Sequence, residues 1–337
     1  MNTLMNDTPA HPTRHAGPVL CALLLGAASL LARPAAALPS AAALPSAAAA
    51  PPAAATAEGA APLFVARVVG HGAPIVFIPG LSSAGATYDE TVEHLQSRYE
   101  CHVLTLAGFA GVPAAAGETR DGMLRRVEDS LGEYIRAGKL QHPVLVGHSL
   151  GGFVALEFAA RYPDLAGDLV IVDAFPFAAG VMFHSADAQA ARPQAAQIRH
   201  YVADESQASY LAYIKQGTST RGMVASDADA QKLVAWGLGS DKQVVGLAMY
   251  ELLSTDLRPQ LPSIRSHVLV IGSWAGYPGA SRESVQKTFE EQYRGTAHLA
   301  VVMAEKEHHF IMLDNPGWFD QQLDQFLAGA GAERATR

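Results

Sequence analysis

Short apolar segments alternate with longer amphipathic segments along most of the chain, from residue 63 onward. Several of the short segments are continuous apolar runs, which is typical of strands that are covered on both faces. Seven such candidate strands occur, at Leu63–Val69, Ile75–Ile78, Cys101–Leu106, Val144–Val146, Leu169–Val172, His267–Ile271 and His298–Met303. Helical patterns occur at Asp89–Arg98, Met123–Ala137, Leu150–Arg161, Glu283–Tyr293 and Trp318–Leu327. This alternation predicts an α/β fold with a mostly parallel central sheet and helices on both of its faces.

Residues 176–260 interrupt the alternation. The segment contains no good strand, but it shows helical patterns at Asp187–Val202, Ser206–Lys215, Asp227–Trp236 and Lys242–Leu253. We expect an all-helical lid over one end of the sheet, inserted between core segments at residues 62–175 and 261–330. A second small helical domain, unrelated to any site, is the alternative interpretation.

The amino-terminal segment has the features of an export signal. A weakly basic start at Arg14 and His15 precedes the apolar stretch Val19–Leu31, which is too short to span a bilayer comfortably. The small residues Ala35–Ala37 then provide a cleavage site. We therefore interpret residues 1–37 as a signal peptide and expect a periplasmic or secreted protein with no stable membrane span after cleavage. A retained membrane anchor is the alternative.

Residues 38–61 are of low complexity. Alanine and proline dominate this segment, and the hexapeptide Leu-Pro-Ser-Ala-Ala-Ala occurs twice. Because proline breaks helices and no large apolar face is available for packing, we predict a disordered spacer without a catalytic role.

Composition excludes several classes of function. The chain carries 24 Lys and Arg against 32 Asp and Glu, a net charge of -8, so no basic stripe is available for a nucleic acid. Its two cysteines are too few for a disulfide scaffold or a cysteine-based zinc site. No glycine-rich nucleotide-binding motif lies between a strand and a helix, and we therefore expect no cofactor.

The motif Gly147-His148-Ser149-Leu150-Gly151-Gly152 lies between an apolar strand and a helical pattern. In this context G-x-S-x-G indicates a nucleophile elbow, a sharp turn that presents the serine hydroxyl at the carboxyl edge of the sheet. Glycines two positions before and two after the serine allow neighbouring backbone to pass without a β-carbon clash. The motif therefore predicts that Ser149 is a catalytic nucleophile.

From this motif outward the chain resembles the α/β-hydrolase family over roughly residues 63 to 328. The resemblance rests on Ile78-Pro79-Gly80-Leu81, on the elbow, on the helical insertion, and on His308-His309-Phe310 followed by Asp314-Asn315-Pro316. Family members usually carry His-Gly where this chain has Pro79-Gly80. That departure affects a residue which orders a loop and does not perform the chemistry.

The serine needs a partner that accepts its proton, and histidine is suited to this near neutral pH. The resemblance implies His309, because the family's histidine follows the last strand and is followed by an aromatic residue and an Asn-Pro turn. Phe310 and Asn315-Pro316 match that pattern. His308 is the alternative base.

The residues around this histidine could also suggest a metal site, with Glu305, Glu307, His308 and His309 as candidate ligands. Adjacent histidines rarely converge on one ion, and no H-E-x-x-H spacing occurs. We therefore expect no metal. For the negative charge that develops on the attacked carbonyl, the resemblance implies an oxyanion hole formed by the backbone amides of Leu81 and Leu150.

The acid that orients the histidine is the least certain assignment. The commonest family position is the loop after His267–Ile271, which here contains no acid before Glu283. Another branch of the fold places the acid after the strand that follows the nucleophile helix, and Asp173 ends that strand here. We therefore predict Asp173, with Glu283 as the second candidate; a brace at the start of the lid is the alternative role for Asp173.

Together these features predict an exported serine hydrolase that cleaves an ester or a related acyl bond through an acyl-enzyme intermediate. An aminopeptidase-like or amidase-like enzyme is one alternative, and it would need a lid acid such as Asp204, Glu205 or Asp227 to hold a substrate amine. A non-catalytic binding protein with the same fold is the other. Apolar and aromatic residues in and near the lid suggest a hydrophobic small-molecule substrate, namely Phe175, Phe177, Met182, Phe183, Tyr210, Tyr213, Met223 and Trp236.

Overall fold

A computed structural model describes residues 63–115, 121–217, 220, 222–277 and 279–334. The predicted signal peptide at residues 1–37 and the predicted spacer at residues 38–61 lie outside the described residues. Among the helices that are described, none is both long and apolar enough to cross a lipid bilayer.

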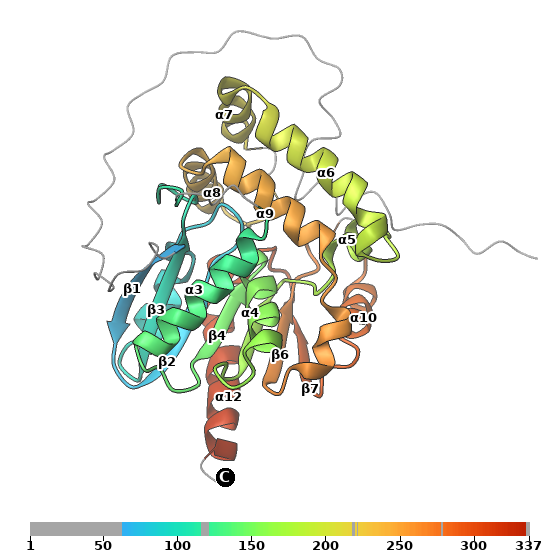
Figure 1. Ribbon diagram of the computed structural model, residues 1–337. Coiled ribbons are helices and arrows are strands. Elements are labelled where there is room, and N and C mark those ends of the chain that lie inside the picture. The colour runs from blue at the N-terminus through green and yellow to red at the C-terminus, as the bar shows by residue number, and fades with distance from the viewer. Residues whose placement is uncertain (1–62, 116–120, 218–219, 221, 278, 335–337) are drawn as a thin grey trace, which may run out of the picture.

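Seven strands form one sheet in the order β1-β3-β2-β4-β5-β6-β7 (Figure 1). Their bounds are β1 Phe64–Gly70, β2 Ala73–Ile78, β3 Tyr99–Leu106, β4 Val144–His148, β5 Leu169–Val172, β6 His267–Gly272 and β7 His298–Met303. Only β1 is antiparallel to its neighbour, β3, and all other neighbouring strands pair in parallel. The predicted mostly parallel sheet is therefore confirmed, with strand ends that differ from the prediction by a few residues because backbone pairing extends beyond the apolar runs.

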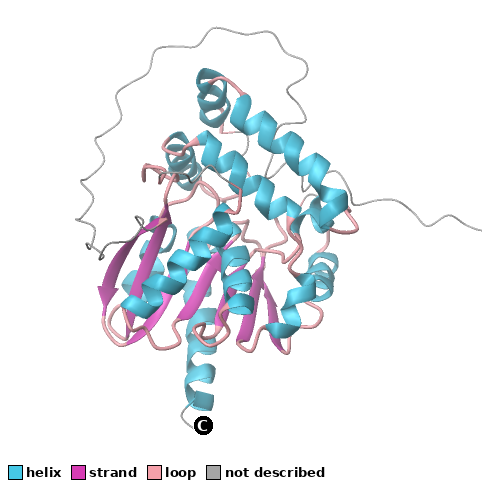
Figure 2. Cartoon of the chain, viewed as in Figure 1, coloured by secondary structure: helices cyan, strands magenta, loops and turns pink. Residues whose placement is uncertain are grey.

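Helices cover both faces of the sheet, as predicted (Figure 2). One face packs against α3 Met123–Ala137, α4 Leu150–Arg161 and α10 Arg282–Gln292, and the other against α2 Asp89–Leu95 and α12 Pro316–Arg334. The short elements η2 Gly85–Tyr88, η3 Arg258–Ser263 and α11 Ile311–Asp314 complete the core.

The continuous apolar strands follow from this double coverage. In β5, Leu169 and Ile171 join the core beneath α3 and α4, whereas Val170 and Val172 join the core beneath α2 and α12. Because side chains alternate along a strand, a strand buried on both faces must be apolar at every position.

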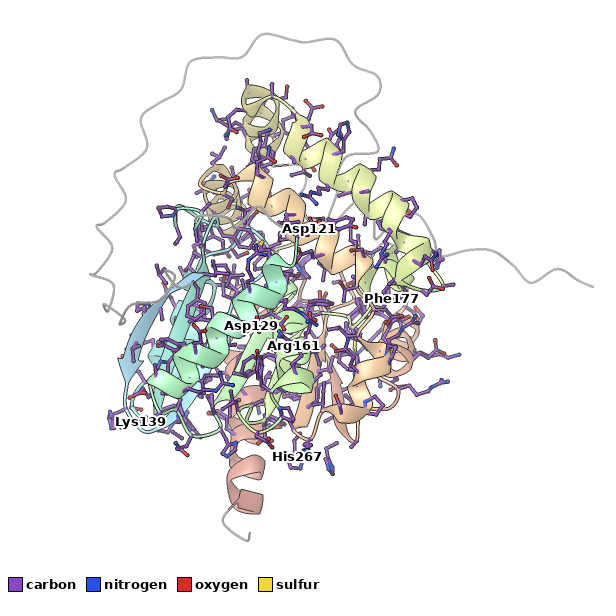
Figure 3. All side chains as sticks on the ribbon, viewed as in Figure 1. Asp121, Asp129, Lys139, Arg161, Phe177 and His267 are labelled. Carbon is purple, nitrogen blue, oxygen red and sulfur yellow. The ribbon has the colours of Figure 1, made fainter. Side chains whose placement is uncertain are left out.

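Polar side-chain contacts also link the covering helices. Arg161 at the end of α4 donates hydrogen bonds to Glu128 and Asp129 of α3 and forms an ion pair with Asp129, and Figure 3 shows Asp129 and Arg161 side by side on these two helices.

In its described residues, the segment between β5 and β6 contains five α-helices, α5 Ala178–Met182, α6 Ala188–Asp204, α7 Gln207–Lys215, α8 Asp227–Leu238 and α9 Lys242–Ser254. They lie beyond one end of the sheet, with α6 running along α9 (Figure 1). Glu251 of α9 accepts hydrogen bonds from the first backbone amides of α3, those of Met123 and Leu124, at 2.9 and 2.8 Å. A carboxylate at this position satisfies unpaired amides and complements the helix dipole, so it ties the helical segment to the core.

Candidate active site

Ser149 occupies a sharp turn between β4 and α4. Its backbone has φ 52° and ψ −117°, an unusual conformation for a residue with a side chain, and its amide donates a hydrogen bond to the Val172 carbonyl at 2.9 Å. A β-carbon on Gly151 would lie 2.1 Å from the Ile78 carbonyl oxygen, and one on Gly147 would lie 2.3 Å from the Gly151 carbonyl oxygen. The glycines are therefore required by close backbone contacts, as the motif predicts.

The ends of four neighbouring strands are linked one residue beyond the regular sheet. After the bond from Ser149 to Val172, the Asp173 amide donates to the Ile271 carbonyl and the Ala304 amide donates to the Gly272 carbonyl, both at 2.8 Å. These bonds hold the residues that follow β4, β5, β6 and β7 at one edge of the sheet. In open α/β sheets this edge is the usual position of a ligand site.

Asp173 and His309 are in direct contact at this edge. The His309 Nδ1 atom lies 2.7 Å from Asp173 Oδ2, although the two residues are 136 positions apart in sequence. The Asp173 side chain is fully buried, and its backbone has a φ of 47°. Two strained residues with chemically active side chains, Ser149 and Asp173, thus occupy neighbouring strand ends, and such strain is concentrated at functional sites.

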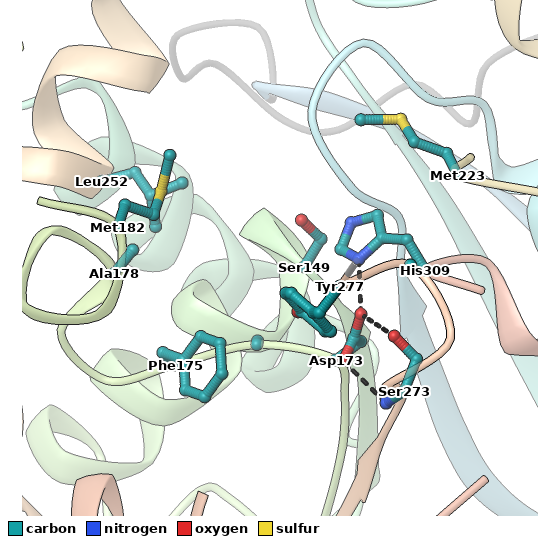
Figure 4. A pocket seen from close by; sticks show the side chains of 12 residues that line it. Ser149, Asp173, Phe175, Ala178, Met182, Met223, Leu252, Ser273, Tyr277 and His309 are labelled. Carbon is teal, nitrogen blue, oxygen red and sulfur yellow. Dashed lines mark hydrogen bonds and ion pairs between the residues drawn. The ribbon is translucent and has the colours of Figure 1, made fainter. Parts of the chain in front are cut away.

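The Ser149 hydroxyl lies beside the imidazole of His309 and on the opposite side of the ring from Asp173 (Figure 4). The serine is half-buried, and the His309 side chain is 17% exposed. The structure therefore brings Ser149, His309 and Asp173 together in the order required for proton transfer from the serine to a histidine that a carboxylate orients.

The alternative residues lie elsewhere. Glu283 is fully exposed in the first turn of α10, where hydrogen bonds from its own backbone amide and from Ser281 lower its pKa. His308 pairs through Nδ1 with Asp314 at 2.9 Å. Glu307 accepts hydrogen bonds from the backbone amides of Glu305 and Lys306 and from the Asn315 side chain. Burial raises the pKa of Glu307, but these hydrogen bonds outweigh that effect and lower it. Each group has a structural partner away from Ser149.

Among the described residues, no three His, Cys, Asp or Glu side chains are grouped closely enough to hold a metal ion. Of the candidate ligands, His308, His309 and Glu307 instead contact Asp314, Asp173 and Asn315 respectively, and Glu305 is exposed.

The two amides predicted for the oxyanion hole belong to the loop after β2 and to the start of α4. Neither the Leu81 amide nor the Leu150 amide donates a hydrogen bond to another part of the chain that the structure describes. A β-carbon on Gly80 would lie 2.9 Å from His148 Nδ1 and 3.3 Å from the Ser149 β-carbon, so glycine lets this loop pass close to the elbow without a shift of these side chains. Both amides therefore remain free to bind a substrate oxygen near Ser149.

His148 has a structural role that its position in the motif does not reveal. It is fully buried, its ring packs at a tilt against the rings of His309 and Phe310, and its Nε2 atom lies 3.0 Å from the His309 carbonyl oxygen. Burial and the nearby His309 lower its pKa well below the usual value, so the neutral ring donates its Nε2 hydrogen to that carbonyl. His148 thus supports the backbone of the His309 loop.

Ser273 is a second residue whose role the sequence does not reveal. Its amide donates to Asp173 Oδ1 at 2.9 Å and its hydroxyl donates to Asp173 Oδ2 at 2.8 Å. The only signal in the sequence is a hydroxyl residue directly after the sixth strand, where an acid would be more usual.

Two cavities meet at Ser149, His309 and Met223. The first encloses about 600 Å³ and is lined chiefly by Ala174, Phe175, Ala178, Met182, Leu252 and Tyr277 (Figure 4). The second encloses about 940 Å³ beneath the helical segment and is lined chiefly by Leu81, Tyr201, Tyr210, Tyr213, Trp236 and Met249. Both volumes include space that is open to solvent.

Six of the eight residues that suggested an apolar lid surface line one or both of these cavities. Phe177 and Phe183 do not line them. The Phe177 ring instead packs against the guanidinium of Arg258, 4.5 Å away.

The fold and the arrangement of residues at the strand ends define a class of protein. A sequence profile of the alpha/beta hydrolase family matches residues 75–322, well over half of the chain. The chain therefore belongs to the α/β-hydrolase family, and the resemblance inferred from its motifs is confirmed.

Curated relatives include a protein of Mycobacterium phage D29 named as a non-heme haloperoxidase, which is 26% identical over 212 residues. That alignment covers 59% of this chain and 69% of the phage protein. The pimeloyl-acyl-carrier-protein methyl ester esterase of Chromobacterium violaceum is 30% identical over 114 residues, 34% of this chain and 41% of the esterase. The chain thus spans less than half of the length of that enzyme.

Solved structures include a thermophilic esterase from Thermogutta terrifontis, with a TM-score of 0.64 at 19% sequence identity. The superposition covers 79% of this chain and 93% of the esterase. At this identity the likeness shows the fold alone. The family match and the relatives together support a hydrolase acting on a small molecule.

Proposed function

We propose that the chain is a serine hydrolase that cleaves an ester or a related acyl bond, with Ser149 as nucleophile, His309 as base and Asp173 as orienting acid. The observation that carries this proposal is the 2.7 Å contact between His309 Nδ1 and Asp173 Oδ2. It holds the Nδ1 proton against the carboxylate, so the Nε2 lone pair is left to accept the proton of Ser149.

The reaction then follows from the positions of these groups. The Ser149 oxygen attacks the acyl carbon while His309 accepts its proton, and the amides of Leu81 and Leu150 bind the resulting oxyanion. His309 returns the proton to the leaving alcohol as the carbon–oxygen bond breaks, which leaves an acyl group on Ser149. Water attacks that acyl group with the same histidine as base, and the acid product and free serine result.

The cavities favour an uncharged, apolar substrate. Apart from Asp173 and His309, their ionisable lining groups are tyrosines, and burial raises the pKa of Tyr210 to about 12, so this phenol is neutral near pH 7. A charged substrate would lose its hydration there without gaining a charged partner. An ester with apolar groups therefore fits better than an amino acid or a phosphate ester.

The aminopeptidase alternative has less support. Asp204, Glu205 and Asp227, the candidates for holding a substrate amine, are exposed and do not line either cavity. We also propose that residues 176–260 act as a lid, since helices of this segment line both cavities, and that residues 1–37 direct export.

The nucleophile is tested by Ser149→Ala, which removes the hydroxyl but little buried volume. We expect a loss of about 10⁶-fold in turnover of chromogenic esters, with thermal stability nearly unchanged. Retention of more than about a hundredth of the wild-type rate would contradict the covalent mechanism. A fluorophosphonate that failed to label Ser149 in the folded protein would instead favour a non-catalytic binding protein.

A further inference from the structure

Besides His309, Ser273 holds the carboxylate of Asp173. The Ser273 amide donates to Oδ1 at 2.9 Å and the Ser273 hydroxyl donates to Oδ2 at 2.8 Å. Both residues are buried, with 4% of Asp173 and 1% of Ser273 exposed. Because water does not reach this carboxylate freely, these two donors and His309 replace its hydration.

The two hydrogen bonds determine the rotation of the carboxyl plane. One donor engages each oxygen, so the plane cannot turn without breaking at least one bond. Oδ2, the oxygen that the Ser273 hydroxyl holds, is also the oxygen that contacts His309 Nδ1. Ser273 therefore sets the direction from which Asp173 meets the imidazole (Figure 4).

The position of Ser273 explains how a carboxylate can be held beside His309 although no acid directly follows β6. Ser273 directly follows Gly272, the last residue of β6, and Asp173 directly follows Val172, the last residue of β5. These strands pair in parallel, with Val172 opposite Ile271, so their ends lie side by side. The carboxylate comes from β5, and β6 contributes the donors that hold it.

We propose that Ser273 is a positioning residue for the reaction and acts through Asp173 on the orientation and basicity of His309. The inference rests on the proposed serine hydrolase function. Two other titratable groups lie near Asp173, Tyr277 and Tyr293; burial, together with the charge of Asp173, raises the pKa of both phenols well above the usual value. Both phenols stay neutral near pH 7, which leaves His309 as the charge partner of Asp173.

The test is Ser273→Ala, which removes the hydroxyl donor and keeps the backbone donor. We expect kcat to fall by about 10- to 100-fold, which is the rate factor that corresponds to the loss of one hydrogen bond to a charged group. KM should change by less than about threefold, because Ser273 acts through Asp173. The acid limb of the kcat/KM profile should move to higher pH. Without the hydroxyl, Oδ2 carries more negative charge toward the ring, which stabilises protonated His309.

Two further variants separate positioning from a general loss of packing. Ser240→Ala removes an equally bonded buried hydroxyl between α8 and the loop after β3, and it should lower stability without moving the acid limb. Ser273→Cys retains a weaker donor and should give a kcat between those of the wild type and Ser273→Ala. If Ser273→Ala folds poorly, Ser273→Cys tests the proposal in its place. The low-field NMR resonance of the His309 Nδ1 proton should shift in Ser273→Ala and stay in place in Ser240→Ala.

The inference is overturned if folded Ser273→Ala retains kcat within about threefold and an unmoved acid limb, or if Ser240→Ala moves the limb equally. Failure of the proposed function gives a different result, because Ser149→Ala would then remain active whatever Ser273→Ala does. An inactive Ser149→Ala beside a wild-type Ser273→Ala refutes the role of Ser273 alone.

Discussion

The replacement Asp173→Asn tests the orienting acid with little change in shape. An amide group must take the place of one carboxylate oxygen. The Oδ1 position faces the Ser273 backbone amide at 2.9 Å, a donor that cannot turn away. The new NH₂ group is therefore expected at the Oδ2 position, opposite His309 Nδ1 and the Ser273 hydroxyl.

An NH₂ group at this position needs an acceptor, and His309 supplies one only by changing its tautomer. The ring proton then resides on Nε2, which faces Ser149 and can no longer accept the serine proton. A wrong tautomer with intact geometry lowers kcat by about 10⁴-fold, which corresponds to about 5 kcal/mol of barrier. Asparagine tolerates the φ of 47°, so we expect the fold to be retained.

The assay measures kcat on an ester whose hydrolysis depends on Ser149, together with thermal unfolding of each variant. Glu283→Gln is the matched control, because it makes the same carboxylate-to-amide change on an exposed residue at the start of α10 and should leave kcat unchanged. If folded Asp173→Asn kept more than about a tenth of the wild-type kcat, Asp173 would not be the orienting acid. A comparable loss in Glu283→Gln would also refute the reasoning.

Three further predictions concern stability, pH and processing. Gly151→Ala should lower the unfolding free energy by about 3 kcal/mol or more in denaturant titrations, whereas Gly317→Ala, with open space around it, should not; equal stabilities would contradict the close-contact argument. Burial and the charge of Glu157 raise the pKa of Glu128 from 4.5 to about 9, so its contribution to stability is largest below pH 4.5 and is lost as the pH rises through 9. Glu128→Gln should therefore flatten the decline in stability over that range, and an unchanged slope would show that Glu128 is not its source. Amino-terminal sequencing of the exported product should return a chain that begins near Leu38, and a soluble cytosolic product that begins at Met1 would refute export.

Local features of the chain were predictable because they depend on neighbours in sequence. The glycines around Ser149 indicate the elbow: Gly147 is required by a backbone contact inside the motif, although the contact that requires Gly151 is with Ile78 at the distant end of β2. The inner strands β2, β4, β5 and β6 follow from apolar runs that are buried on both faces, whereas the edge strands β1 and β7 are apolar runs with mostly exposed or half-buried residues. The register of the His309 loop follows from the aromatic residue and the Asn-Pro turn beside it.

Contacts between distant segments depended on the tertiary structure. The sequence left Asp173 and Glu283 as alternatives, because each lies near the end of a strand and neither is close to His309 along the chain. The order of the strands determines which of the two contacts His309: β5 lies between β4 and β6, so Asp173 at its end reaches His309, whereas Glu283 is exposed in the first turn of a helix.

The sequence by itself determined most of the strands and helices and the turn at Ser149, whose signals are backbone and burial constraints, and the family resemblance pointed to His309. Only the tertiary structure decided that β1 runs antiparallel, that Asp173 reaches His309, and that Ser273 and His148 hold these two residues in place. These are pairings between segments up to 161 positions apart, and no local pattern encodes which strand ends become neighbours.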